Sequence, residues 1–280
     1  MEQTAHLPDG YPPLIQYDRL PHNPILQDMI RFNSQFLLDN RSALEYYSKR
    51  WVPDPLHNWS RRWEYPFCYA KLQTFLAATD RKHYGILDAG SGNTFFPFFV
   101  ASAHRNIVVD CVDIDPSVID FGRKLQAQGN SAVNYCHGDL RRLDHSDRSL
   151  DAIYSISVLE HISSRLQIVS EFARVLKPGG RLVITLDVSL NGTGEIPVTE
   201  TSSLLRSLST DFLPDQDYSL AVRTIREGAI LTSDHARTID ATLVPWERWG
   251  FWTSVRNFFR SGRFHANLVL TVFCTAWTKR

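Results

Sequence analysis

The stretch ILDAGSGNTFF at residues 86–96 decides the fold class. A short apolar run ends in Asp88, and Gly90 and Gly92 follow with one residue between them. Glycines in a turn after a strand let the backbone approach a ligand closely, because no Cβ stands in the way. A dinucleotide turn of the form GxGxxG would need a third glycine where Phe95 stands, and the chain has no Tyr-xxx-Lys pair. An NAD-dependent reductase is therefore disfavoured.

Short apolar strands alternate with helices from this stretch onward. Pro116 is placed to open one of the helices, since proline fits a first turn. The alternation predicts right-handed crossovers and a mostly parallel sheet. We expect strands at residues 84–90, 106–115, 132–139, 149–157 and 180–188, and helices at 94–103, 116–128 and 165–176.

The flanking segments break this rhythm. Residues 1–25 are rich in proline, which predicts an arm. The apolar residues at 24–47 and at 60–78 recur with helical spacing, and Ser60 is the expected N-cap of the second helix. We predict an arm and helical cap over 1–83 and a core over 84–280. The core is a doubly wound, seven-stranded α/β sheet with a substrate-side insertion at about 190–245, which holds a helix at 200–208 and a loop at 209–219. An antiparallel hairpin of strands 249–259 and 267–277 closes it.

Charge and cysteine content narrow the function classes. Lys plus Arg and Asp plus Glu both number 30, so a nucleic-acid partner, which requires a basic face, is disfavoured. None of the four cysteines forms a CxxC pair. We expect Cys111 and Cys136 to be small buried residues, and predict a reducing, cytoplasmic location with no zinc site. We also expect no signal peptide and no membrane span.

Five motifs mark the ends of successive strands. They are DAGSG at 88–92, VDID at 112–115, HGDL at 137–140, SISVLEHI at 155–162 and LKPGG at 176–180. In this order and spacing, residues 84–187 resemble the class I S-adenosylmethionine-dependent methyltransferases, in the branch that acts on small molecules. The resemblance implies a Rossmann-like fold, S-adenosylmethionine as cofactor and a small-molecule substrate.

The resemblance assigns the methionine end of the cofactor to two strand ends. Gly90 and Gly92 would pass beneath the methionine part, and Asp88 would order the turn and the amino group. The backbone at Ser155 and Ile156 would face the same end.

The resemblance assigns the binding of the ribose and the adenine to residues at the ends of the next two strands. Asp113 would hold the ribose hydroxyls, and Ile114 would pack on the adenine. Asp139 and the Leu140 amide would read the adenine edge. One departure stands in the turn, where Thr94 occupies the position of the family's third glycine.

The helix expected at 60–78 supplies a candidate wall. Trp63 and Tyr65 would line the cofactor site, and Arg62 would bind the methionine carboxylate as a bidentate donor. The alternative is an aromatic helix face that packs on the sheet. An aromatic lid suits a flat or partly apolar small molecule.

Three residues are candidates for a catalytic base. His161 follows the fourth strand, Asp187 ends the fifth, and His235 lies in the insertion. A structural role for His161 is the alternative. Some ubiquinone-pathway O-methyltransferases resemble this segment but carry a Glu where Ser157 stands, so we predict no metal.

The sequence thus predicts an enzyme that transfers a methyl group from S-adenosylmethionine to an O or N atom of a small metabolite, of the secondary-metabolite or sugar type. A degenerate methyltransferase acting as a binding module is the alternative. An RNA methyltransferase is disfavoured, because SISV at 155–158 replaces an Asn-Pro-Pro-aromatic signature. The arm at 1–25 could pack on a second copy of the chain.

Overall fold

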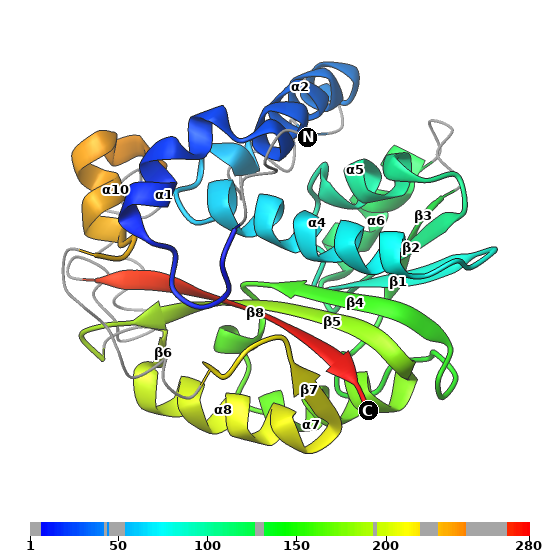
Figure 1. The fold of residues 1–280 in the computed structure, drawn as a ribbon. Helices are drawn as coiled ribbons and strands as arrows, with labels where there is room; N and C mark the ends of the chain where they lie inside the picture. The colour runs from blue at the N-terminus through cyan, green and yellow to red at the C-terminus, as the bar shows by residue number, and fades with distance from the viewer. Residues whose placement is uncertain are drawn as a thin grey trace.

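An open α/β sheet with helices on both faces forms the body of the protein (Figure 1). The computed structural model describes residues 7–41, 44, 54–126, 132–192, 195–218, 229–244 and 268–280. The sheet order is β3-β2-β1-β4-β5-β8-β7, with β6 pairing β5. The predicted doubly wound, mostly parallel fold is confirmed, but the described residues form eight strands instead of the predicted seven, because the two-residue strand β6 also pairs with β5.

The parallel strands coincide closely with the predicted ones. The chain crosses between β1 and β4, since both β2 and β4 pair with β1. This switch in strand order is where ligands bind in open α/β sheets. The parallel strands are β1 (Tyr84–Ala89), β2 (Ile107–Asp113), β3 (Val133–His137), β4 (Leu150–Ile156), β5 (Leu176–Ser189) and β6 (Ile196–Pro197).

The last part of the sheet is antiparallel. Strand β8 (Leu270–Lys279) runs between β5 and β7 (Phe212–Pro214) and opposes both. The predicted terminal antiparallel strand is thereby confirmed at β8. Its predicted partner at 249–259 lies outside the described residues. The loop predicted at 209–219 was wrong in part, because Phe212–Pro214 forms β7 against the C-terminal half of β8.

The helices form where the sequence supplies residues that favour a helix N-terminus and apolar residues that can be buried. The Asn23 side chain accepts from the Ile25 and Leu26 amides at 2.9 and 3.2 Å and starts α2. Pro97 lies in the first turn of α5, as expected. The helices are α1 (Leu14–Arg19), α2 (Pro24–Asp39), α4 (Arg61–Ala78), α5 (Phe96–Ala103), α6 (Pro116–Gln126), α7 (Arg165–Val175), α8 (Val198–Asp211) and α10 (Ser233–Ile239), with 3₁₀ turns η1 (Leu20–His22), η2 (Pro55–His57), η3 (Leu159–His161) and η4 (Ala241–Leu243).

Two buried clusters pack against the two faces of the sheet. Helices α2, α4, α5 and α6 contribute to one cluster, and α7 and α8 contribute to the other. Neighbouring residues of a strand point to opposite faces, as Ile86 and Leu87 of β1 do. Cys111 is buried as expected. The expectation for Cys136 was wrong: it is exposed, because it lies near the end of the edge strand β3.

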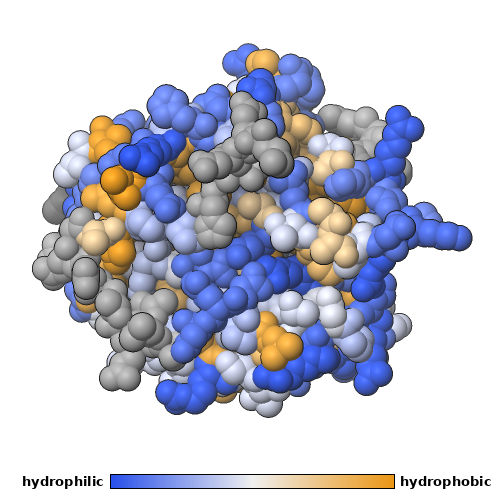
Figure 2. Space-filling view, viewed as in Figure 1, coloured by the Kyte–Doolittle hydropathy of each residue, from blue (hydrophilic) through white to orange (hydrophobic). Residues whose placement is uncertain are grey.

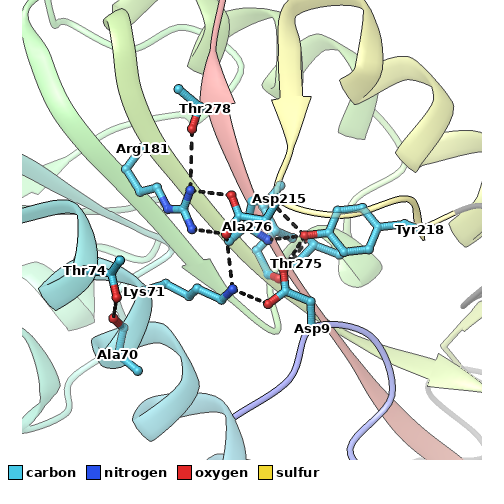
Figure 3. Close-up of polar contacts among 11 residues, drawn as sticks. Asp9, Ala70, Lys71, Thr74, Arg181, Asp215, Tyr218, Thr275, Ala276 and Thr278 are labelled. Carbon is cyan, nitrogen blue, oxygen red and sulfur yellow. Dashed lines mark hydrogen bonds and ion pairs between the residues drawn. The ribbon is translucent and has the colours of Figure 1, made fainter. Parts of the chain in front are cut away.

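The arm pairs with the last strand of the sheet through an antiparallel bridge between Gly10 and Cys274 of β8. The Gly10 amide donates to the Cys274 carbonyl at 2.7 Å, and the Cys274 amide donates back at 3.0 Å. A polar network beside this bridge joins the arm to α4 and to the sheet (Figure 3). Lys71 contacts Asp9 and also Asp215, at 3.1 Å, and Arg181 donates to both oxygens of Asp215.

Tyr218 joins the same network. Its hydroxyl donates to Asp9 at 2.5 Å, and it also lies 2.9 Å from both the amide and the carbonyl of Ala276. The Asp9 carboxylate of the arm is therefore bound by groups of the same chain (Figure 3). A contact with a second copy stays a prediction.

The surface of the cap is partly apolar. Figure 2 shows hydrophobic surface gathered where Figure 1 places α1 and α10, whose exposed apolar side chains are Ile15 and Ile239. Within the described residues, no helix combines the length and the apolar character that a membrane crossing requires.

Candidate functional site

The glycine turn after β1 adopts the conformation that only glycine accepts easily. Gly90 has φ +80° and Gly92 has φ +52°. The Gly90 amide donates to the Val112 carbonyl at 2.9 Å, which joins the turn to β2. A Cβ on Gly90 would stand 2.6 Å from a methyl group of Val158 in the loop after β4. The turn is therefore held between the ends of β2 and β4.

Asp113 lies at the tip of β2 and faces this turn. Its carboxylate accepts from the Gly92 amide at 3.0 Å and from the Asp115 amide at 2.9 Å. The next residue, Ile114, leaves 61% of its surface exposed although it is apolar. An oriented carboxylate beside an open apolar surface suits a ribose with its attached base.

Asp88 is buried beneath the turn. Its carboxyl accepts a hydrogen bond from the Tyr154 hydroxyl at 3.0 Å. Burial raises the pKa of Asp88 to about 8, and the nearby Asp113 charge raises it further, against the Tyr154 hydrogen bond. The carboxyl can thus hold a proton near neutral pH.

Asp139 stands at the tip of β3, as expected. Both of its oxygens accept from the Arg141 side chain, and the Arg141 amide donates to it at 2.9 Å. This pairing lowers the pKa of Asp139. Leu140 beside it is buried. The two residues therefore share the carboxyl-end edge of the sheet with Asp113.

Trp63 and Tyr65 of α4, predicted to line the cofactor site, are both buried in the core beside the turn. Tyr65 stacks on Phe96 with ring centroids 4.7 Å apart, and its hydroxyl shares a hydrogen bond with Thr94. Thr94 also accepts from the Phe96 amide at 3.3 Å. Trp63 is fully buried, and its indole N–H finds no hydrogen-bond partner among the described residues.

Arg62 and its neighbour Arg61 lie on different sides of α4. The positive charge of Arg62 opposes the burial that raises the pKa of Tyr17 to about 12, which places Arg62 near α1. Arg61 instead reaches the end of β4, where its guanidinium donates to the Ser157 hydroxyl at 2.6 Å. The arginine that meets the strand tips is thus Arg61.

Glu64 joins α4 to the tips of two strands. It is fully buried, accepts from the hydroxyls of Ser157 at 2.7 Å and Thr185 at 2.5 Å, and pairs with Arg61. Ser157 has φ +49°, a strained value for a residue with a side chain. Strain of this kind gathers at functional sites and requires the surroundings to hold it in place.

Asp187 and His161 lie beside this cluster, as sequence reasoning placed them. Asp187 lies near the end of β5, and its amide donates to Glu160 at 3.0 Å. His161 pairs with Glu195 at 3.1 Å. Burial lowers the pKa of His161, but Glu195 and Glu160 raise it more, so that it lies at about 9. At neutral pH His161 is therefore a cation.

The remaining candidates take other positions. His235 of α10 lies 3.5 Å from Asp18 of α1, within the cap. The Ser155 hydroxyl is buried and donates to the Ala89 carbonyl at 3.2 Å, and Ile156 packs on the core. Within the described part of the chain, no group of three or more His, Cys, Asp or Glu side chains could hold a metal.

Four residues that meet at the tips of β4 and β5 were not predicted from the sequence, namely Arg61, Glu64, Glu160 and Thr185. Arg61 and Glu64 stand three residues apart on one helix, which places them on one face. Glu160 lies inside the LEH motif, next to His161, which the sequence suggested as a candidate base. Thr185 is an inward residue of β5. Only the helix spacing gave a signal, because contacts between α4 and the strands depend on the tertiary fold.

The comparisons with known proteins agree with this geometry. The sheet order and the glycine turn define a Rossmann-like methyltransferase fold. Residues 87–184 match the family described as a methyltransferase domain. This match and the methyltransferases among the relatives confirm the resemblance of the motifs to the class I S-adenosylmethionine-dependent methyltransferases.

Individual relatives match parts of the chain. A probable S-adenosylmethionine-dependent methyltransferase of Mycolicibacterium smegmatis is 30% identical over 146 residues, which cover 51% of this chain and 52% of that protein. A 27-O-demethylrifamycin SV methyltransferase of Amycolatopsis mediterranei is 30% identical over 111 residues, 39% of each. This chain therefore spans about half and about two fifths of these relatives.

One solved structure shows the same fold. It is the geranyl diphosphate C-methyltransferase from Streptomyces coelicolor A3(2), which covers 79% of this chain and 77% of its own with a TM-score of 0.53. The sequence identity is 14%. The likeness therefore concerns the fold alone.

Proposed function

We propose that this protein transfers a methyl group from S-adenosylmethionine to an O or N atom of a small molecule. The observation that carries the proposal is the arrangement at the tips of β1 and β2. There the Asp113 carboxylate is fixed on the Gly92 amide beside the exposed Ile114. The family membership and the small-molecule methyltransferases among the relatives support it.

The residues present fit the cofactor. Glycines at 90 and 92 leave the turn without side chains, and Asp113 offers a carboxylate to two ribose hydroxyls. Ile114 offers an apolar surface to the adenine. When bound, S-adenosylmethionine supplies an activated methyl group, so the protein must chiefly align the acceptor and exclude water.

The cluster beside the turn is the proposed place for the acceptor. Asp187, His161 and the aromatic side of α4 lie next to the tips of β4 and β5. Asp187 is retained as a candidate base, whereas His161, a cation at neutral pH, would contact the acceptor without taking its proton. His235 lies against α1 and is not retained for that role. A metal-independent reaction and a cytoplasmic location, both predicted from the sequence, complete the proposal.

The rival is a degenerate fold that binds but does not react. Thr94, which replaces a glycine of the family pattern, raised this alternative. Its hydroxyl bonds Tyr65 and the Phe96 amide, so it serves the turn rather than blocking it. This favours an intact cofactor site.

Calorimetry with S-adenosylmethionine and a product assay for S-adenosylhomocysteine test the two readings together. We expect binding in the micromolar range and product in the presence of an acceptor from a panel of phenols, alcohols, sugars and amines. Binding without product over the whole panel favours the rival. Absence of binding at millimolar cofactor rejects the enzyme and leaves the degenerate fold as a binding module for another partner.

A further inference from the structure

Two residues with buried carboxyl oxygens lie beside each other near the ends of β4 and β5. Glu160 follows β4 in η3, and Asp187 lies two residues before the end of β5. The Asp187 amide donates to Glu160 Oε1 at 3.0 Å, so the Glu160 carboxyl is anchored on the neighbouring strand. The other oxygen of Glu160 and Oδ1 of Asp187 are buried and find no hydrogen-bond partner among the described residues. Two buried hydrogen-bond acceptors thus have no donor among the described residues.

The other carboxylates around this pair have cations of their own. Glu64 pairs with Arg61 from α4, and Glu195 pairs with His161 at 3.1 Å. Glu160 and Asp187 have no ion pair among the described residues. A buried, unpaired acceptor costs free energy unless a ligand or a proton satisfies it.

We propose that Glu160 and Asp187 form a proton-accepting subsite for a hydroxyl-bearing methyl acceptor, with Glu160 as the base. This rests on the proposed methyl transfer. The acceptor O–H bond breaks and its proton passes to Glu160 Oε2. The oxygen lone pair forms the bond to the methyl carbon. The S–CH₃ bond breaks, and its electron pair returns to sulfur in S-adenosylhomocysteine.

The chemistry of the pair selects the acceptor. Two inward carboxyl oxygens match a group that donates hydrogen bonds, and they repel a phosphate or carboxylate brought to the same place. A neutral hydroxyl donates and then surrenders its proton. The subsite therefore disfavours anionic acceptors and favours alcohols, phenols and sugars.

The ionisation of the pair agrees with this role. Burial raises the pKa of Glu160 to about 7, which His161 and the Asp187 amide partly oppose and Glu64 increases. Burial, Glu64 and Glu160 raise the pKa of Asp187 well above its ordinary range, against Arg61 and His161. A base with a pKa near the working pH is the most effective.

Carbon-13 NMR of the carboxyl groups gives the acceptor-free test. In the protein with S-adenosylhomocysteine bound, we expect one proton to leave the pair between pH 6 and 8. In Glu160→Gln this step should vanish. The surface variant Glu200→Gln, which affects only an ion pair with Arg165, should keep it. A pair that stays fully ionised from pH 5 to 9, or a step unchanged in Glu160→Gln, overturns the proposal.

Transfer to hydroxyl probes gives the second test. We expect wild-type protein to methylate a phenol or sugar of the panel and not the matched phosphate ester. Glu160→Gln should lower kcat at least a hundredfold and shift the pH profile, while the Kd for S-adenosylmethionine stays within twofold. Transfer only to amine, thiol, carbon or anionic acceptors overturns the proposal, as does an unchanged kcat. Failure of wild-type protein to bind the cofactor would instead reject the proposed function.

Discussion

Val158 occupies the space that a side chain on Gly90 would need. Its two methyl carbons lie 2.6 and 2.7 Å from the position of a Cβ on Gly90. The loop after β4 is thereby packed directly on the turn after β1. The two strand ends that flank the switch in strand order are therefore in direct contact.

Gly90→Ala should therefore destabilise the protein in two ways. Forcing alanine to φ +80° costs roughly 1–3 kcal/mol, and the clash with Val158 adds about 1–3 kcal/mol. Gly179→Ala is the matched control, because Gly179 has φ +74° and nothing within 4 Å of its Cβ position. Urea unfolding of both variants measures the difference. Equal losses would show that Val158 does not constrain the turn.

Asp113→Ala should weaken S-adenosylmethionine binding at least tenfold, because it removes a carboxylate that is already oriented by two amides. Asp110→Asn on the same strand is the control. Asp110 contacts His145 and Asn134, so cofactor affinity should stay unchanged. Calorimetric Kd values decide, and an unchanged Kd in Asp113→Ala would refute the ribose placement.

Glu64→Gln should cost about 3–5 kcal/mol of unfolding free energy, since it leaves the charge of Arg61 without its buried partner. Adding Arg61→Gln should restore part of the loss. Thermal and urea unfolding of the single and double variants complete the cycle. Purely additive losses would mean that the two side chains act independently.

Tyr218→Phe should destabilise the arm by about 1–3 kcal/mol, because Asp9 and Ala276 lose a buried partner. Tyr11→Phe provides the contrast. The Tyr11 hydroxyl is buried without a hydrogen-bond partner among the described residues, so its removal should be neutral or stabilising. Both rings pack on Phe273. Limited proteolysis of the arm and urea unfolding report the two effects.

Asp88 should make stability depend on pH. Its pKa of about 8 in the folded protein exceeds its ordinary value of 3.8. Between these values the folded state keeps a proton that the unfolded state has lost, so stability falls as pH rises from about 4 to 8. The slope from this residue is at most about 1.4 kcal/mol per pH unit. Asp88→Asn should flatten the curve, and a curve as steep as that of wild type would contradict the assignment.

Most of the parallel core could be predicted from sequence. The apolar runs before Asp88, Asp113 and Asp187 are strands because both faces of a central parallel sheet are buried. Strand β7 could not be predicted, because its three residues become a strand only by pairing with β8, more than fifty residues later. The exposure of Cys136 likewise depends on which strand lies at the edge.

The candidate site was predictable where it follows strand ends. Asp113 and Asp139 stand at the tips to which their motifs assigned them. Arg61 was passed over for Arg62, since sequence gives no helix rotation relative to the sheet. Glu160 stood inside a recognised motif, but its free oxygen is visible only once β5 lies beside it.

The pairing of Gly10 with Cys274 sets an order on folding. Strand β8 lies inside the sheet. Gly10 of the arm pairs with Cys274 of this strand, more than 250 residues later in the chain. Contacts so distant in sequence require a large loop to close before they form, which slows folding. The parallel strands can assemble first. Strand β8 then pairs with β5, and the arm pairs with β8 last. A kinetic intermediate with β1 to β5 formed and the arm still open to protease follows from this topology.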